Sequence, residues 1–251
     1  TLPVPLFRQV ILQTSIAVST AESRPILTGI HMVIANNQLK AVATDSHRLS
    51  QRIIPLEMPE TSNALTFEIT LPGKTLIELS RIIDGLETID FAITENQVLF
   101  QTETLSFYSR LLEGRYPDTD RLINDQFNTA ITVVASDLVA AVDRASLMSH
   151  TDKNNIATLS INENRILLTG NSPEIGKVEE EIMVENYEGA SLDVSFNPDY
   201  LKDALRLFGS SEATIQFLEA NRPFTLTLKD NHSDIPYSFI QLVTPVRTFN
   251  G

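Results

Sequence analysis

The hydrophobic positions of the chain follow the same order twice, in two halves of similar length. Each half opens with apolar residues three or four positions apart, which predicts an amphipathic helix. Ser136 is the expected N-cap of the second of these helices. The apolar positions are Leu6, Val10, Ile11, Thr14 and Ala17 in the first half and Leu138, Ala141, Val142 and Ala145 in the second.

A β-hairpin is expected after each of these helices. In the first half the runs 29–34 and 39–44 are rich in β-branched residues and are separated by an asparagine-containing turn. In the second half the runs 157–161 and 166–169 have the same arrangement. Such runs around turn-forming residues predict pairs of antiparallel strands.

A second helix is expected in each half, at 71–83 and at 196–208. The two segments align with one offset, since Leu76 corresponds to Leu201, 125 positions later. Further strands follow, of which 89–93 matches 214–218.

The repeated order predicts an α+β fold of two tandem domains, 1–124 and 125–251. Each domain is expected to contain two helices packed on antiparallel sheet. The proline and aspartate of Arg115-Tyr116-Pro117-Asp118 suit the connection between the domains.

Composition narrows the class of protein. The chain has no cysteine, so disulfides and thiolate metal sites are excluded. No apolar run approaches the ~18 residues of a membrane helix, so we expect a cytoplasmic protein with no membrane partner. A net charge of -13 argues against an ordinary DNA-binding module, whose domain is usually basic. Any contact with nucleic acid must therefore use a local basic surface.

The residues offer little enzyme chemistry. Asp45-Ser46-His47 contains the residue types of a hydrolase triad, but neighbours in a strand or tight turn cannot line up as nucleophile, base and orienter. The four histidines, His31, His47, His150 and His232, lack the spacing of a zinc site. We therefore expect no catalytic residue, no metal and no cofactor.

A set of cations lies on the exposed faces of the expected helices. Carboxylates occur three or four positions away, so the pattern alone favours a solvated face with ion pairs along each helix. The cations are Arg8, Lys74 and Arg81 in the first half and Arg144, Lys202 and Arg206 in the second.

Five segments, in this order, resemble the landmark segments of the bacterial β sliding clamp family, the β subunits of DNA polymerase III. The resemblance covers essentially the whole chain. The segments are 24–29 (RPILTG), 43–49 (ATDSHRL), 113–118 (EGRYPD), 196–201 (FNPDYL) and 244–247 (TPVR).

The resemblance implies a processivity factor of the replicative polymerase. Members of the family have three similar domains, and two subunits close into a homodimeric ring around duplex DNA. This chain resembles the middle and C-terminal domains, so we expect the N-terminal clamp domain to be absent and the fragment to be mostly monomeric. In the family the helices line the hole of the ring, which makes the six cations candidates for contacts with DNA phosphates.

The resemblance also implies a groove between the two domains that binds short linear peptides. Its partners would be replicative and repair DNA polymerases, the clamp loader and other proteins with clamp-binding peptides. The middle-domain side would comprise Leu27, Thr44, His47, Arg48, Leu49, Pro117, Arg121 and Leu122. The C-terminal side would comprise Tyr200, Asn221, Pro223, Leu242, Thr244, Pro245, Val246 and Arg247.

Two positions depart from the family pattern, because Ser46 stands where glycine is common and Thr244 where methionine is common. The floor of the groove is therefore expected to differ in shape.

Two other functions remain open on the residues alone. One is a two-repeat intracellular peptide-binding scaffold unrelated to DNA, whose helical cations are only solvated surface. The other is an enzyme whose carboxylates converge only in three dimensions.

Overall fold

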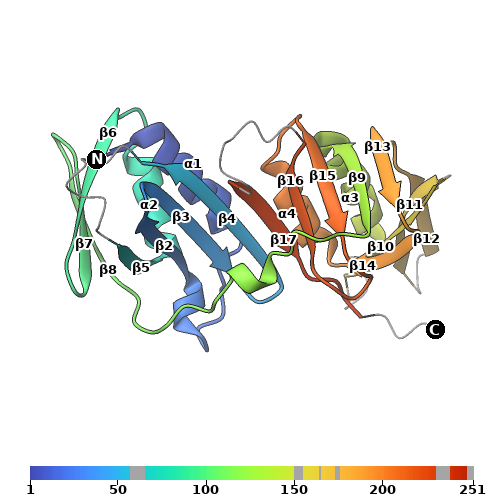
Figure 1. Ribbon diagram of the computed structural model, residues 1–251, viewed down its shortest axis with the longest axis horizontal. Coiled ribbons are helices and arrows are strands. Elements are labelled where there is room, and N and C mark those ends of the chain that lie inside the picture. The colour runs from blue at the N-terminus through green and yellow to red at the C-terminus, as the bar shows by residue number, and fades with distance from the viewer. Residues whose placement is uncertain (57–65, 150–154, 164, 173–175, 230–237, 248–251) are drawn as a thin grey trace. The chain divides into compact units, whose positions relative to one another are not determined.

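A computed structural model describes residues 1–56, 66–149, 155–163, 165–172, 176–229 and 238–247 (Figure 1). The chain divides into two compact units, the first built mainly from Thr1–Thr119 and the second mainly from Asp120 onward.

The first unit contains two helices and two groups of antiparallel strands. The strands pair in the orders β1-β6-β7-β8 and β4-β3-β2-β5. Its elements are β1 Leu2–Pro3, α1 Val4–Ser15, η1 Pro25–Thr28, β2 Gly29–Ala35, β3 Gln38–Thr44, β4 Arg48–Pro55, β5 Phe67–Pro72, α2 Gly73–Ile82, β6 Thr88–Ile93, β7 Gln97–Gln101 and β8 Ser106–Arg110.

The second unit repeats this plan, with strands in the orders β12-β11-β10-β14 and β13-β9-β15-β16-β17. Its elements are η3 Asp120–Leu122, β9 Thr129–Val134, α3 Ala135–Ser149, β10 Ala157–Asn162, β11 Arg165–Ser172, β12 Gly176–Glu181, β13 Asn186–Gly189, β14 Leu192–Phe196, α4 Pro198–Arg206, β15 Glu212–Phe217, β16 Phe224–Leu228 and β17 Phe239–Val243. The α+β fold of two similar units is therefore confirmed.

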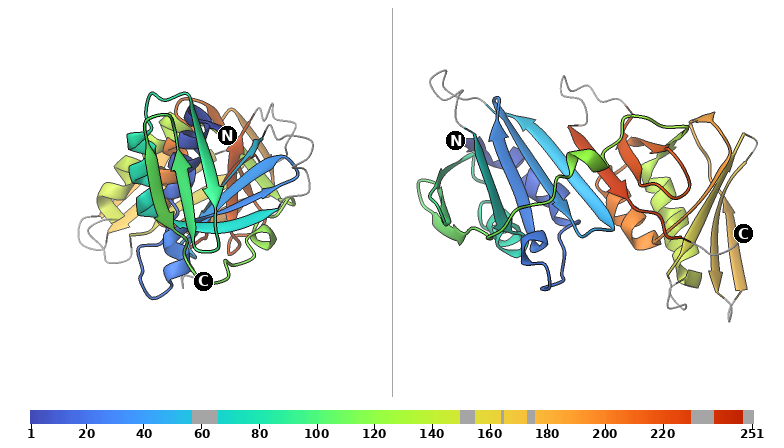
Figure 2. Two further views of the ribbon diagram at one scale, coloured as in Figure 1. Left: turned by 90° about the vertical axis from the view of Figure 1, so that its left-hand side faces the viewer. Right: turned by 60° about the horizontal axis from the view of Figure 1, so that its bottom comes forward.

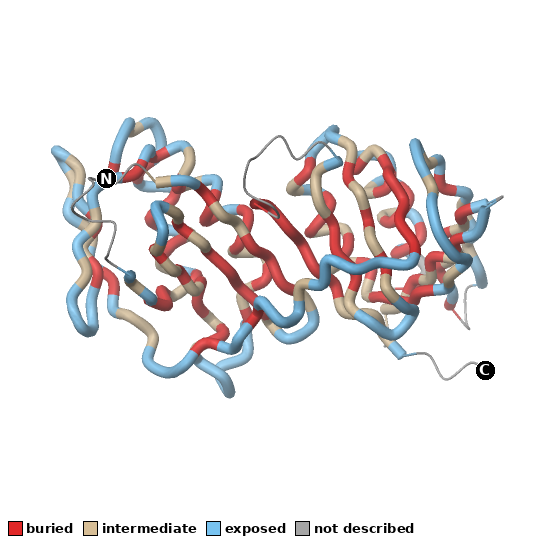
Figure 3. Tube along the Cα trace, viewed as in Figure 1, coloured by how far each residue is buried: buried red, intermediate tan, exposed pale blue. Residues whose placement is uncertain are grey.

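Alternation of buried and exposed positions explains the strands (Figure 3). In β10 the side chains of Ala157, Leu159 and Ile161 are buried, while the residues between them are partly exposed. A strand with this period of two places one face on the core. Asn36 and Asn37, at the turn between β2 and β3, both have positive φ, which asparagine tolerates in two-residue hairpin turns.

The helices bury their apolar stripes. Phe7, Val10 and Ile11 of α1 and Leu76 and Leu79 of α2 are at most 1% exposed. In the second unit α3 and α4 lie side by side, and α3 packs against β11 and β12 (Figure 2). The outer faces of the helices carry polar and charged side chains and a few exposed apolar ones, such as Leu12 and Leu147.

The start of α3 differs from the sequence expectation. The helix begins at Ala135, so Ser136 lies inside its first turn and is not the N-cap. The β9 ladder runs as far as Val134, and the amide of Ala135 donates to the carbonyl of Ser211, so strand and helix follow without a capping residue between them. Asn197 caps α4 instead, and its side-chain oxygen accepts from the amide of Asp199 at 2.9 Å.

No helix in the described ranges is long and apolar enough to cross a membrane.

At Gly170 of β11 the backbone of α3 comes close to the sheet. A Cβ atom at this position would collide with the backbone oxygen of Ala145 in α3. Backbone cannot move aside as a flexible side chain can, so any larger residue must push α3 away from the sheet.

We predict that Gly170→Ala lowers the free energy of unfolding by about 1–3 kcal/mol, the usual cost of overpacking. The measurement is the urea midpoint followed by circular dichroism. Thr169→Ala, which removes atoms at the neighbouring position of β11, is the control and should change the midpoint less. A Gly170→Ala midpoint equal to that of the wild type would contradict the close approach.

Candidate functional site

The turn between β3 and β4 is held by the carboxylate of Asp45. Its Oδ1 accepts from the amides of His47 and Arg48 at 2.9 and 3.0 Å, and its Oδ2 accepts from Arg48 Nε at 3.1 Å. The side chains of Asp45 and Arg48 are only 14% and 16% exposed. This carboxylate therefore supports the turn and is not available to orient a histidine base.

The conformation of this turn bears on Ser46, the position where glycine is common in the family. Ser46 has φ of 81°, in the left-handed region that glycine adopts without steric cost. Its amide donates to Thr44 Oγ1 at 3.1 Å, and that hydroxyl donates to the carbonyl of Arg48 at 2.7 Å. These bonds hold Ser46 in a conformation that a residue with a side chain rarely takes.

The buried side chain of Tyr116 supports the same turn. Its hydroxyl oxygen accepts from the amide of Thr44 at 3.0 Å, and its ring stacks on that of His31 at 4.6 Å. Burial raises the pKa of Tyr116 to about 12, against the opposing effect of the Thr44 bond. His31 Nδ1 in turn lies 3.0 Å from Thr70 Oγ1 of β5. Thr44 is therefore linked to β5 through the stacked rings of Tyr116 and His31.

The first unit brings several of the expected groove residues to this turn and buries the others. His47 and Pro117 are exposed, and Arg48 is paired with Asp45. Leu27, Thr44 and Leu49 are 2%, 6% and 1% exposed, so they form the support beneath the surface.

The second unit contains a hollow of about 410 Å³ that gathers three of the expected residues, Arg121 and Leu122 of η3 and Pro223. Arg121 and Leu122 had been expected on the middle-domain side, and the structure places them in the second unit. The hollow mixes apolar and cationic side chains and includes no carboxylate. It is also lined by Ile123, Asn124, Gln126, Gln216, Leu218, Arg222 and Thr225.

The remaining expected residues of the second unit lie elsewhere. The amide of Val246 donates to the carbonyl of Ser195 at 2.7 Å, which fixes the segment 244–247 beside the end of β14. Tyr200 is half-buried in the first turn of α4, three residues after the cap Asn197. Leu242 is 3% exposed in β17, and Asn221 is exposed but does not line the hollow.

Four of the six helical cations are engaged in ion pairs. Arg8 pairs with Asp84, and Arg144 with Glu180. Lys202 and Arg206 pair with carboxylates of both α3 and α4. Lys74 and Arg81 of α2 are exposed and have no ion pair within the described residues.

Some features were not expected from the sequence. A hollow of about 610 Å³ in the first unit is lined by His31, Glu68, Arg110 and Tyr116 among others. These residues come from three strands and a loop. Their spacing along the chain does not predict that they lie together. Within the described part of the chain no group of three or more acidic or histidine side chains could hold a metal. His150 and His232 lie outside the described residues.

Comparison with known families gives two matches in series. Residues 1–118 match the model of the DNA polymerase III beta subunit, central domain. Residues 120–241 match that of the C-terminal domain of the same subunit.

Individual relatives agree with these matches. The chain is 46% identical over 245 residues to the beta sliding clamp of Streptococcus pneumoniae, covering 97% of this chain and 63% of that protein. It is 42% identical to the beta sliding clamp of Bacillus subtilis, again over 99% of this chain and 64% of the relative. The chain therefore spans less than two thirds of the length of the relatives it matches.

Solved structures show the same likeness. The DNA polymerase III beta chain of Streptococcus pneumoniae superposes with a TM-score of 0.92 at 45% identity, covering 98% of this chain and 64% of that one. The sliding clamp of Bacillus subtilis superposes with a TM-score of 0.91 at 41% identity, covering 98% of this chain and 63% of that one.

We predict that His31 makes stability depend on pH. Burial lowers its pKa below the ordinary value of 6.5, Lys40 adds to this, and Glu68 opposes it. Below about pH 6.5 the unfolded chain binds the proton more readily, so the free energy of unfolding falls as the pH drops through the lowered pKa. The stabilisation is fully present above that range.

The test compares urea midpoints at pH 7.5 and 5.5. His31→Gln should flatten the loss seen in the wild type, whereas His47→Gln, at an exposed position, should leave it. An unchanged pH dependence in His31→Gln would refute the assignment.

Proposed function

Because the chain belongs to the DNA polymerase III beta subunit family, the beta sliding clamps, we propose that it acts as part of a processivity factor that encircles duplex DNA and binds polymerase peptides. The supporting observation is the match of both units, in order, to the central and C-terminal domains of that subunit. We further propose that the role is that of a non-catalytic accessory subunit. The engagement of the Asp45 carboxylate with Arg48 and the turn amides supports this role.

The peptide site is proposed to include the hollow beside η3. Leu122 is 46% exposed there, which is high for a large apolar side chain, and Leu218 and Pro223 add apolar surface. Arg121 and Arg222 border these groups. Apolar surface beside arginine suits a short peptide with leucine or aromatic anchors and polar or acidic neighbours.

The exposed turn at His47 in the first unit and the segment 244–247 in the second are each proposed as a further peptide-contacting surface, since the turn is held by the Asp45 carboxylate and the segment by the bond from the Val246 amide to the Ser195 carbonyl. A rigid surface loses little conformational entropy when a peptide binds. The partners proposed are DNA polymerases of replication and repair, the clamp loader and other proteins with such peptides.

Contact with DNA is proposed through the helices. A net charge of -13 does not prevent this, because a ring that encloses DNA needs only weak local attraction. Few phosphate contacts give a weak, salt-sensitive interaction, which leaves the ring free to slide.

Ring closure is proposed to use the edge strand β12 of the second unit. Among the described residues β12 pairs only with β11, so its other edge is open to another chain there. Leu147 of the neighbouring helix α3 is 68% exposed. An open strand edge beside an exposed leucine suits an interface between subunits.

We predict that a peptide of the glutamine-leucine-x-leucine-phenylalanine type binds this chain and that Leu122→Ala weakens binding about tenfold, or ~1.4 kcal/mol, through lost apolar contact. Arg121→Ala should also weaken binding. Isothermal titration calorimetry gives both affinities. Leu12→Ala is the matched control, because Leu12 is 47% exposed on α1. Equal affinities for the wild type and both site variants would exclude this hollow.

We predict that the 251-residue chain alone sediments as a monomer and leaves circular DNA as readily as linear DNA. The reason is that the proposed ring is made of six domains, and the chain has two units. Sedimentation velocity and gel filtration on nicked circular DNA measure these properties. Retention on the circle that is lost when the circle is cut would show that the chain closes a ring without further domains.

A further inference from the structure

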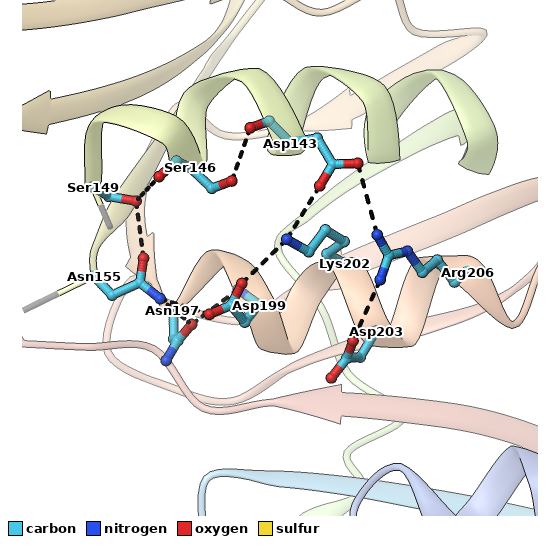
Figure 4. Close-up of polar contacts among 9 residues, drawn as sticks. All are labelled: Asp143, Ser146, Ser149, Asn155, Asn197, Asp199, Lys202, Asp203 and Arg206. Carbon is cyan, nitrogen blue, oxygen red and sulfur yellow. Dashed lines mark hydrogen bonds and ion pairs between the residues drawn. The ribbon is translucent and has the colours of Figure 1, made fainter. Parts of the chain in front are cut away.

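The outer face of α3 and α4 is crossed by a network of charged side chains (Figure 4). Asp143 of α3 lies between two cations of α4. Its Oδ1 is 3.1 Å from Lys202 Nζ, and its Oδ2 is 3.8 Å from Arg206 Nη2. Asp143 is thus the one carboxylate in this network that contacts both cations.

Each cation has a second carboxylate on its own helix. Lys202 Nζ lies 3.2 Å from Asp199, and Arg206 Nη1 lies 3.9 Å from Asp203. The group therefore contains three carboxylates and two cations, a net charge of -1 by formal count. The lysine and the arginine are thus matched by carboxylates within the described part of this face.

Lys202 is the more firmly held cation. Its side chain is 12% exposed, whereas that of Arg206 is 55% exposed. Asp199 is fixed in turn by Asn155, whose Nδ2 donates to Asp199 Oδ2 at 2.7 Å. Burial alone would lower the pKa of Lys202, but its hydrogen bonds with Asp143 and Asp199 outweigh that effect and raise it. The lysine cannot reach a phosphate without leaving both carboxylates.

On the corresponding helices of the first unit, fewer of the cations are held in ion pairs. Lys74 and Arg81 of α2 are exposed and, as far as the structure describes the chain, belong to no ion pair. Arg8 is turned toward α2, since its Nε donates to the carbonyl of Ser80 at 2.7 Å and its guanidinium pairs with Asp84. Two cations of the first unit are therefore free to attract phosphate.

We propose that Asp143 shields the α3–α4 face from the phosphates of duplex DNA, so that α2 supplies most of the attraction between this chain and DNA. The inference rests on the proposed function, in which both pairs of helices face the duplex. Asp143 does not contact the DNA itself; it holds the side chains of Lys202 and Arg206. A shielded face lowers the number of phosphate contacts and leaves the DNA free to move along it.

The test measures binding of a fluorescein-labelled 20-base-pair duplex by anisotropy, over a series of salt concentrations. Asp143→Asn should tighten binding about threefold at low salt and steepen the dependence on salt, because a carboxylate is removed and Lys202 and Arg206 each lose one of their two ion-pair partners. Asp203→Asn, which removes one partner of Arg206 and none of Lys202, should give a smaller gain. The matched control is Asp137→Asn, an exposed position of α3 that contacts neither cation, and it should stay within the error of the wild type.

Amide chemical shifts of the chain, recorded while the same duplex is added, locate the contact. In the wild type the shifts should move on α2, and in Asp143→Asn they should move on α4 as well. A purely structural role of Asp143 would change the melting temperature and not this distribution.

The outcomes separate the inference from the proposed function. If Lys74→Ala and Arg81→Ala weaken binding but Asp143→Asn binds as the wild type does, the shielding by Asp143 is refuted and the DNA-facing role stands. If Asp143→Asn gains no more than Asp137→Asn, the shielding is also refuted. If neither the wild type nor any variant binds the duplex at low salt, both proposals fail together.

Discussion

The close packing of helix on sheet is the constraint on which the rest of the structure depends. At Gly170 the backbone of α3 lies so near β11 that a single added carbon would collide with it. Packing this tight commits the apolar stripes of the helices to the core and leaves only their outer faces for binding. The neighbouring side chains on that outer face therefore decide whether a helical cation is free to contact a partner.

That outer face differs between two units of the same plan. In the first unit Lys74 and Arg81 stand exposed on α2, while in the second Asp143 occupies the space between Lys202 and Arg206. The fold repeats because the apolar pattern repeats. The electrostatics do not repeat because surface charges are free to vary without disturbing the core. One fold can thus carry helix faces that differ in how their cations are paired.

In the turn at Asp45, by contrast, most of the polar groups form hydrogen bonds that hold the shape of the backbone. Its carboxylate, the Thr44 hydroxyl and the Tyr116 hydroxyl oxygen bind the amides of Thr44, Ser46, His47 and Arg48. The same carboxylate holds the Arg48 side chain. A turn held in this way presents a fixed surface.

The sequence by itself determined the two-unit α+β fold, because hydrophobic periods of 3.6 and 2 depend only on local geometry. It also carried the resemblance to the clamp family and the pairing of Lys202 with Asp199, which are three positions apart on one helix. Only the tertiary structure decided that Asp143 contacts both cations of α4, that Leu122 and Pro223 share one hollow, and that His31 stacks on Tyr116. Those contacts join residues from different elements, and their distances depend on how whole helices and strands pack, which no local pattern encodes.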